Sequence, residues 1–248
     1  MNEDINLAGQ LIVALDYPDA SAAEALLDEL SGIPCYMKVG MQLFYAAGPA
    51  FIERLKRDGY RIFLDLKMHD IPNTVRGGAQ SITSMGVDMF NVHAAGGLRM
   101  MEAAMQGVEA ARVTGNAQSD PIVIAVTQLT STNQQMLNDE IGIAGSVEDA
   151  VVRYAQLARA AGLHGVVASP LEVDRIKEAC GKAFITVTPG IRPTGADIGD
   201  QSRIMTPGQA LRQGTDYIVV GRPITAAPSP REAAMAIITE MSDARQQI

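Results

Sequence analysis

Eight short apolar segments alternate with longer amphipathic, alanine-rich segments along this chain, and this alternation restricts the possible folds more than any other feature. Short apolar runs bounded by turn residues predict buried strands, and longer periodic segments predict helices. Eight strands interleaved with helices form a closed (β/α)8 barrel, for which 248 residues is an ordinary length. The expected strands are residues 10–16, 35–39, 61–66, 89–93, 122–127, 165–169, 184–188 and 217–220. The expected helices are residues 20–30, 49–58, 74–85, 98–111, 147–161, 171–179, 207–213 and 230–242.

The pattern therefore predicts an α/β protein with a single domain, a (β/α)8 TIM barrel over residues 1–248, in which residues 1–8 form an N-terminal tail. An open, doubly wound sheet is the alternative, but it usually has about five or six strands and a glycine-rich first turn. Here the first expected strand ends Leu15-Asp16-Tyr17-Pro18, without a G-x-G-x-x-G pattern. A dinucleotide site of that kind is therefore not expected.

Composition and charge narrow the class of partner and the cellular location. A net charge of −8 with 19% charged residues argues against a nucleic-acid-binding surface. Cys35 and Cys180 have neither metal nor redox spacing and are expected to be reduced and structural. The N-terminus has no signal-peptide pattern, and no apolar stretch reaches the roughly 18 residues of a membrane span. We therefore expect a cytoplasmic globular protein.

A cluster of charge lies at the end of the third expected strand. Side chains on a strand alternate between its faces, so Asp65 and Lys67 should point the same way as Phe63. A third charge, Asp70, follows just beyond the strand. An isolated Asp-x-Lys pattern would more often be a weak surface ion pair. A carboxylate and an ammonium on one buried face need each other as partners, which makes this segment a candidate site.

Polar or small residues end most of the other expected strands as well. In barrel enzymes the carboxyl ends of the strands and the loops after them form the active site. The repetition of polar ends around the ring therefore favours a catalytic site at that face. These residues are Asp16, Lys38, Asn91, His93, Thr127, Ser169, Thr188 and the Gly221-Arg222 pair.

The loops after the fifth and seventh expected strands, together with the Gly221-Arg222 turn, suit a ligand with an anionic group. Residues 128–133 are rich in hydroxyl and amide groups, and residues 188–201 contain Arg192, Gln201 and several glycines. Loops of this length are uncommon and are often lids or binding loops, or else disordered. Arginine binds phosphate with two parallel hydrogen bonds, and the loops after strands seven and eight are the usual phosphate site of barrels. A phosphate site is therefore expected there.

Together these motifs resemble the orotidine 5′-phosphate decarboxylase family. The resemblance covers the chain from about residue 10 to residue 240, with no departure at any motif position. It implies a (β/α)8 barrel, usually a homodimer with active sites shared across the interface, that uses neither metal nor organic cofactor. It also implies the last step of de novo pyrimidine (UMP) biosynthesis, in which orotidine 5′-phosphate becomes uridine 5′-phosphate and CO2. The matching segments are residues 13–16, 38–40, 63–74, 91–94, 129–131, 187–192, 199–201 and 220–223.

The resemblance also implies roles for individual residues. Lys67 would protonate carbon 6 of the pyrimidine, Asp65 would lie beside the departing carboxylate, and Lys38 would lie between Asp65 and the ribose. Asp70 and Ile71 would come from the neighbouring subunit. The implied catalytic residues are Lys67, Asp65, Asp70 and Lys38. The implied substrate-binding residues are Asp16 and Lys38 at the ribose, Thr130 at the pyrimidine edge, Arg192, Gln201, Gly221 and Arg222 at the phosphate, and Ile71, Thr74 and Pro189.

These residue types suit the chemistry. Loss of CO2 leaves a carbanion in a ring orbital that resonance cannot delocalise, so a fixed ammonium can stabilise it and then deliver a proton. Two alternatives remain open. One is a related barrel decarboxylase that acts on 3-keto-L-gulonate 6-phosphate with magnesium, although Lys38 occupies the expected position of an acidic metal ligand. The other is a non-catalytic barrel that binds nucleotide phosphates.

Overall fold

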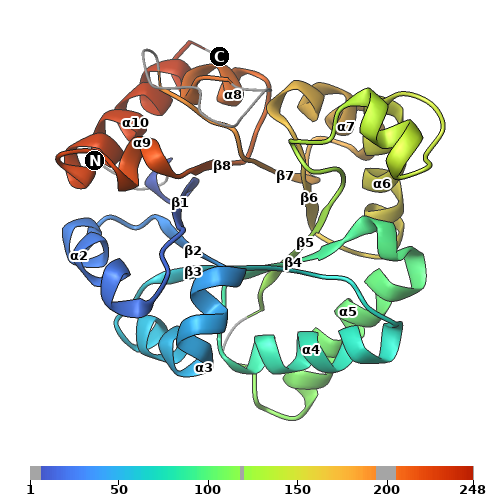
Figure 1. Cartoon of the computed structure of the whole chain (residues 1–248), viewed down its shortest axis with the longest axis horizontal. Helices are drawn as coiled ribbons and strands as arrows, with labels where there is room; N and C mark the ends of the chain where they lie inside the picture. Colours follow the sequence, from blue (N-terminus) through green and yellow to red (C-terminus); the bar gives the residue numbers. More distant parts are fainter. Residues whose placement is uncertain (1–6, 118–119, 194–204, 248) are drawn as a thin grey trace.

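The computed structural model is a closed barrel of eight parallel strands surrounded by helices, as the sequence predicts (Figure 1). It describes residues 7–117, 120–193 and 205–247. The strands are hydrogen-bonded in sequence order, and β8 closes the ring by pairing with β1. In Figure 1 the ring is seen end-on, with the helices forming an outer layer.

The element bounds agree with the expected ranges to within a few residues for most strands. The strands are β1 Leu11–Leu15, β2 Tyr36–Gly40, β3 Arg61–Met68, β4 Met89–His93, β5 Ile122–Val126, β6 Gly165–Val167, β7 Ile185–Thr188 and β8 Tyr217–Val220. The α-helices are α2 Ala20–Leu30, α3 Met41–Arg57, α4 Pro72–Ser84, α5 Leu98–Val113, α6 Val147–Ala160, α7 Val173–Cys180, α8 Pro207–Arg212, α9 Arg222–Thr225 and α10 Pro230–Arg245. Short helical turns are η1 Ala94–Gly96, η2 Met136–Glu140 and η3 Pro170–Glu172.

Three of the expected boundaries are wrong in an informative way. Helix α3 begins at Met41 and not at residue 49, because a helical segment precedes the break at Gly48-Pro49, where Gly48 has φ +69°. β6 ends at Val167 and not at residue 169, because the Ser169 side chain caps η3. β3 runs on to Met68, two residues beyond the expected end. Because of this last difference, Lys67 lies within β3 and not in the loop after it.

The two faces of the strands fill two separate apolar cores. Outward-facing side chains such as Val13 and Leu64 pack against the helices, and inward-facing side chains such as Ile12, Phe63 and Val219 fill the interior of the barrel. This is the alternation that parallel strands impose. The barrel is therefore packed with side chains below its mouth, and an open pocket can form only at an end.

The amino ends of three strands are tied to their neighbours by the same contact. A residue just before the strand, Asp88, His164 or Asp216, accepts a backbone N–H from the preceding strand in the barrel. Asp88 also pairs with Lys56, and Asp216 with Lys177. These contacts join neighbouring strands at the end of the barrel opposite the polar strand ends.

The remaining fold-level expectations concern the terminus and the membrane. Of the N-terminal tail expected over residues 1–8, only Leu7 and Ala8 are described, and both are buried. Among the described residues, no helix combines the length and apolar character needed to cross a membrane.

Candidate active site

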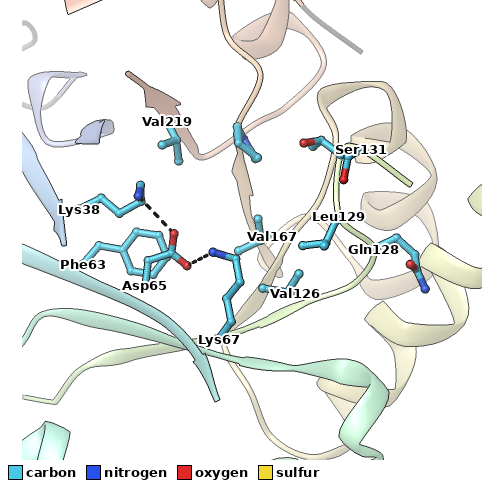
Figure 2. Close-up of a pocket in the computed structure, with 12 residues that line it drawn as sticks. Lys38, Phe63, Asp65, Lys67, Val126, Gln128, Leu129, Ser131, Val167 and Val219 are labelled. Carbon is cyan, nitrogen blue, oxygen red and sulfur yellow. Dashed lines mark hydrogen bonds and ion pairs between the residues drawn. The ribbon is translucent and has the colours of Figure 1, made fainter. Parts of the chain in front are cut away.

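Four charged side chains form one continuous array at the carboxyl ends of β1, β2 and β3. Lys38 Nζ lies 3.2 Å from Asp16 Oδ1 and 3.4 Å from Asp65 Oδ2. Lys67 Nζ lies 2.7 Å from Asp65 Oδ1 (Figure 2). Signs therefore alternate from Asp16 to Lys67, and each ammonium is next to a carboxylate. The sequence predicted that Asp65 and Lys67 share a face, and this is confirmed.

Asp65 lies at the centre of the array and is buried, with a side chain 10% exposed. Burial by itself raises the pKa of its carboxyl group, but Lys38 and Lys67 outweigh that effect together with hydrogen bonds from Lys67 and Asn91. The pKa of Asp65 therefore lies below its usual value, and the group is ionised at neutral pH. Two ammonium groups thus remain held around one buried negative charge.

This shifted pKa predicts a change of stability in acid. Because the pKa of Asp65 is lower in the folded protein than in the unfolded chain, ionisation stabilises the fold above about pH 4. That contribution is lost as the pH falls through the lower, folded-state pKa. We expect the free energy of unfolding in urea to decline less steeply below about pH 4 in Asp65→Asn than in the wild type. Asp243→Asn, at an exposed carboxylate, should keep the wild-type decline, and equal slopes in all three proteins would contradict the assignment.

Asn91 is one of the polar residues expected at the strand ends, but the sequence assigned it no role in the site. It lies on β4 with 1% of its surface exposed. Its Nδ2 donates to Asp65 Oδ1 at 2.7 Å, and its Oδ1 accepts the backbone N–H of Lys67 at 2.8 Å. A polar residue in the middle of the short apolar strand Met89–His93 was the available signal, since a buried amide needs hydrogen-bond partners.

A pocket of about 290 Å³ opens directly over the array, and we call it the inner pocket. Lys38, Asp65 and Lys67 form its charged side. Figure 2 shows the opposing apolar side chains and the segment after β5. Charges at the edge of a partly apolar pocket act more strongly than in water. Its other lining residues are Phe63, Val126, Gln128, Leu129, Thr130, Ser131, Val167, Pro189 and Val219.

A second pocket, the outer pocket, has a volume of about 370 Å³ and two arginines in its wall. Arg192 is buried and Arg222 is exposed. The two pockets share Lys38, Pro189 and Val219, so they are adjacent parts of one depression at the mouth of the barrel. The remaining lining residues of the outer pocket are Ala14, Asp16, Gly190, Gly221 and Thr225.

The other residues expected at the site lie apart from the array or outside the described residues. Asp70, Ile71 and Thr74 are exposed, and the Asp70 carboxylate accepts the backbone N–H of Ile71 at 2.6 Å. Among the described residues, Asp70 has no ion pair within 4.0 Å, so one subunit alone does not join it to Lys67. Gln201 lies outside the described residues.

Two histidines lie close to Lys67 and Asp65 of the array. The rings of His69 and His93 have centroids 5.6 Å apart. Burial, then His69 and Lys67, lower the pKa of His93 below its usual value. His93 is therefore neutral at pH 7 and adds no charge beside Lys67.

The comparisons with known proteins agree with this geometry. A family model described as "Orotidine 5'-phosphate decarboxylase / HUMPS family" matches residues 9–237. The chain belongs to this family. It is 55% identical over 234 residues to the orotidine 5'-phosphate decarboxylase of Moorella thermoacetica, covering 94% of this chain and 92% of that protein. It is 51% identical over 231 residues to the one from Bacillus cytotoxicus, covering 93% and 96% respectively.

A solved structure of the family shows the same fold. The crystal structure of orotidine 5'-phosphate decarboxylase from Lactobacillus acidophilus superposes with a TM-score of 0.83 at 42% sequence identity. The match covers 93% of this chain and 98% of that one. The residues matched by the family model, 9–237, include all eight strands and therefore every strand that contributes to the charged array.

Proposed function

We propose that this protein decarboxylates orotidine 5′-phosphate to uridine 5′-phosphate and CO2, the last step of de novo pyrimidine biosynthesis. The observation that carries the proposal is the array Asp16–Lys38–Asp65–Lys67 at the edge of the inner pocket, beside an arginine-lined outer pocket. The family membership and the names of its relatives support it. Its proposed location is the cytoplasm.

In this mechanism Lys67 acts on carbon 6 of the pyrimidine. As the bond to the carboxylate breaks, its electron pair stays on carbon 6, and the ammonium of Lys67 stabilises that charge. The same ammonium then donates the proton that completes the product. The separation of 2.7 Å between Lys67 Nζ and Asp65 Oδ1 supports this role, because the fixed carboxylate holds the ammonium before the substrate arrives.

The two adjacent pockets suit the two ends of a nucleotide. The base would occupy the inner pocket near Thr130, the ribose hydroxyls would lie at Asp16 and Lys38, and the phosphate would lie at Arg192 and Arg222. Ile71, Thr74, Pro189, Gln201 and Gly221 complete the proposed substrate-binding set. Phosphate binding can lower the barrier at the distant carbon 6, because its energy helps to close the site around the substrate.

Loss of the Arg222 guanidinium should affect the phosphate selectively. Arg222→Ala should lower kcat/KM for orotidine 5′-phosphate. The loss should correspond to roughly 2–4 kcal/mol of transition-state stabilisation, as expected for a lost charge-assisted contact. The substitution should hardly change the slow reaction of the dephosphorylated nucleoside. Arg153→Ala, which removes a guanidinium lying over Tyr154 on α6, should change neither reaction. Equal losses on both substrates would mean that Arg222 supports the fold or the base site instead.

The proposed active unit is a homodimer that shares its sites. Asp70 and the 68% exposed side chain of Ile71 follow the strand that bears Lys67, and Asp70 does not reach Lys67 within one subunit. Met41 and Tyr45 on α3 add exposed apolar surface, at 46% and 73%. An apolar surface beside an incomplete charged site supports pairing with a second copy across a two-fold axis.

The proposal is tested with purified protein and orotidine 5′-phosphate, by following loss of the substrate absorbance and release of CO2 in the presence of a metal chelator. Turnover under these conditions is the expected result. The sequence leaves a related barrel decarboxylase as an alternative, so 3-keto-L-gulonate 6-phosphate with magnesium is the second substrate to test. Activity only on that sugar phosphate, or binding of nucleotides without turnover, would refute the proposal. Lys38 disfavours the magnesium reaction, since its ammonium at 3.4 Å from Asp65 would repel a cation.

A further inference from the structure

β3 contains two more residues than β4 at the level of the charged array. Leu64 pairs with Phe90, but the next pair in the register is Met68 with Val92. Three residues of β3 therefore lie opposite a single residue of β4. Such a bulge interrupts the backbone ladder and leaves N–H and C=O groups in need of other partners.

Asn91 is the single residue opposite this bulge, and its side chain replaces part of the missing ladder. The amide oxygen accepts the backbone N–H of Lys67, and the amide nitrogen donates to Asp65 Oδ1. One buried side chain therefore binds the backbone of one array residue and the carboxylate of another. Asp65 Oδ1 therefore accepts from both Asn91 and Lys67, while Asp65 Oδ2 faces Lys38.

The backbone at Lys67 adopts a conformation that it would not choose by itself. Its φ is +52°, and it is the only non-glycine residue with a positive φ in the described part of the chain. Side chains of L-residues disfavour this left-handed region, and a lysine has no short polar group to stabilise it locally. Such a conformation persists only where the surroundings hold it. In this conformation the Lys67 N–H donates to Asn91 Oδ1 and the Lys67 ammonium pairs with Asp65.

We propose that Asn91 is a positioning residue that holds Lys67 and Asp65 in their reactive arrangement without touching the nucleotide. Asn91 does not line the inner pocket. The inference rests on the proposed function, in which Lys67 donates the proton. Without Asn91, the Lys67 backbone would relax towards an extended conformation and the Asp65 carboxylate would lose its fixed rotation. The ammonium would then no longer lie over carbon 6.

Asn91→Leu removes both hydrogen bonds at nearly constant side-chain size. We expect kcat to fall by at least about 100-fold, as when a reacting group is displaced by about 1 Å. The affinity for uridine 5′-phosphate should stay within about threefold of the wild type, because the expected ribose and phosphate contacts are intact. A crystal structure of the variant should show Lys67 outside the left-handed region. A folded variant with kcat within about threefold of the wild type would overturn the proposal.

The matched control is Thr186→Val, which also removes a buried hydrogen bond from a barrel strand. The Thr186 hydroxyl donates to Asp216 at the amino end of β7, far from the array. We expect this variant to lose thermal stability but to retain kcat within about twofold of the wild type. Equal loss of kcat in Thr186→Val and Asn91→Leu would assign Asn91 a purely structural role.

Asn91→Asp provides an independent test should the leucine variant fail to fold. The introduced carboxylate can still accept the Lys67 N–H, but it can donate to Asp65 only when protonated. We therefore expect its activity relative to the wild type to be highest near pH 5 and to fall as the pH rises to about 8, because two ionised carboxylates repel. A constant ratio of the two activities across this range would overturn the proposal.

The groups that face this position support that reading of the pH profile. Asp65 and Lys67 face it from β3, and Ile124, its register partner on β5, has no charge. His93 on β4, with the His69 ring beside it, has a pKa below its usual value because of its burial. Inactivity of the wild type on orotidine 5′-phosphate would refute the proposed function, whereas an active wild type with an unaffected Asn91→Leu would refute this inference alone.

Discussion

Replacement of Lys67 by alanine should abolish decarboxylation while the protein still binds uridine 5′-phosphate. The ammonium stabilises negative charge at carbon 6 and supplies the proton, so its loss removes two contributions from the same step. We expect kcat to fall by more than about 10³-fold, the upper range for loss of a single charge-stabilising donor. The measurement is single-turnover decarboxylation, paired with titration of the nucleotide product.

The control is Lys182→Ala, which removes an exposed ammonium just after α7. It should leave kcat and product affinity at their wild-type values. Product affinity within about tenfold of the wild type in Lys67→Ala would show that the pockets are intact. Turnover of Lys67→Ala within about tenfold of the wild type would exclude Lys67 as the proton donor.

A mixture of two inactive variants should regain activity if the sites are shared between subunits. Lys67→Ala and Asp70→Asn should each be nearly inactive alone. If Asp70 acts on the partner's site, a mixed dimer has one site with both mutations and one site with neither. Random exchange makes about half of the dimers mixed, and half of their sites are intact, so roughly a quarter of the wild-type activity should return.

The matched control for this mixture is Lys67→Ala combined with Asp65→Asn. Both residues belong to the same array within one subunit, so every site in a mixed dimer keeps one mutation and no activity should return. Subunit exchange is verified separately with differently tagged chains. Exchange without recovery in the Lys67→Ala and Asp70→Asn mixture would place Asp70 in its own subunit's site.

Much of the fold could be predicted because its signal is local in the sequence. Each apolar run and each amphipathic segment is specified by its own residues, and the barrel follows from their number and order. The pairing of Asp65 with Lys67 could also be predicted, since side chains two positions apart on a strand face the same way. The boundaries that failed, at Met41 and Ser169, depend on a helix break and a side-chain cap. Neither of these changes the apolar pattern.

The bulge in β3 and the role of Asn91 could not be predicted in the same way. Register is a relation between two strands, and the apolar pattern of β3 contains no sign of two extra residues. A positive φ is expected at glycine, whereas here it occurs at Lys67, where contacts with β4 impose it. The hydrogen bonds that Asp88, His164 and Asp216 accept from the preceding strands could not be predicted either, because each joins residues far apart in the sequence. The roles of the site residues and the shared dimer stay predictions.

The extra residues in β3 limit how this chemistry can be transplanted into an artificial scaffold. Idealised barrels use regular strands and keep positive φ for glycine. A designer who grafts Asp and Lys two positions apart onto such a strand would reproduce the spacing but not the backbone that aims the ammonium. A functional graft must therefore move β3 and β4 together, with the bulge and the asparagine opposite it, because a reactive geometry is specified by its supporting residues as much as by its charges.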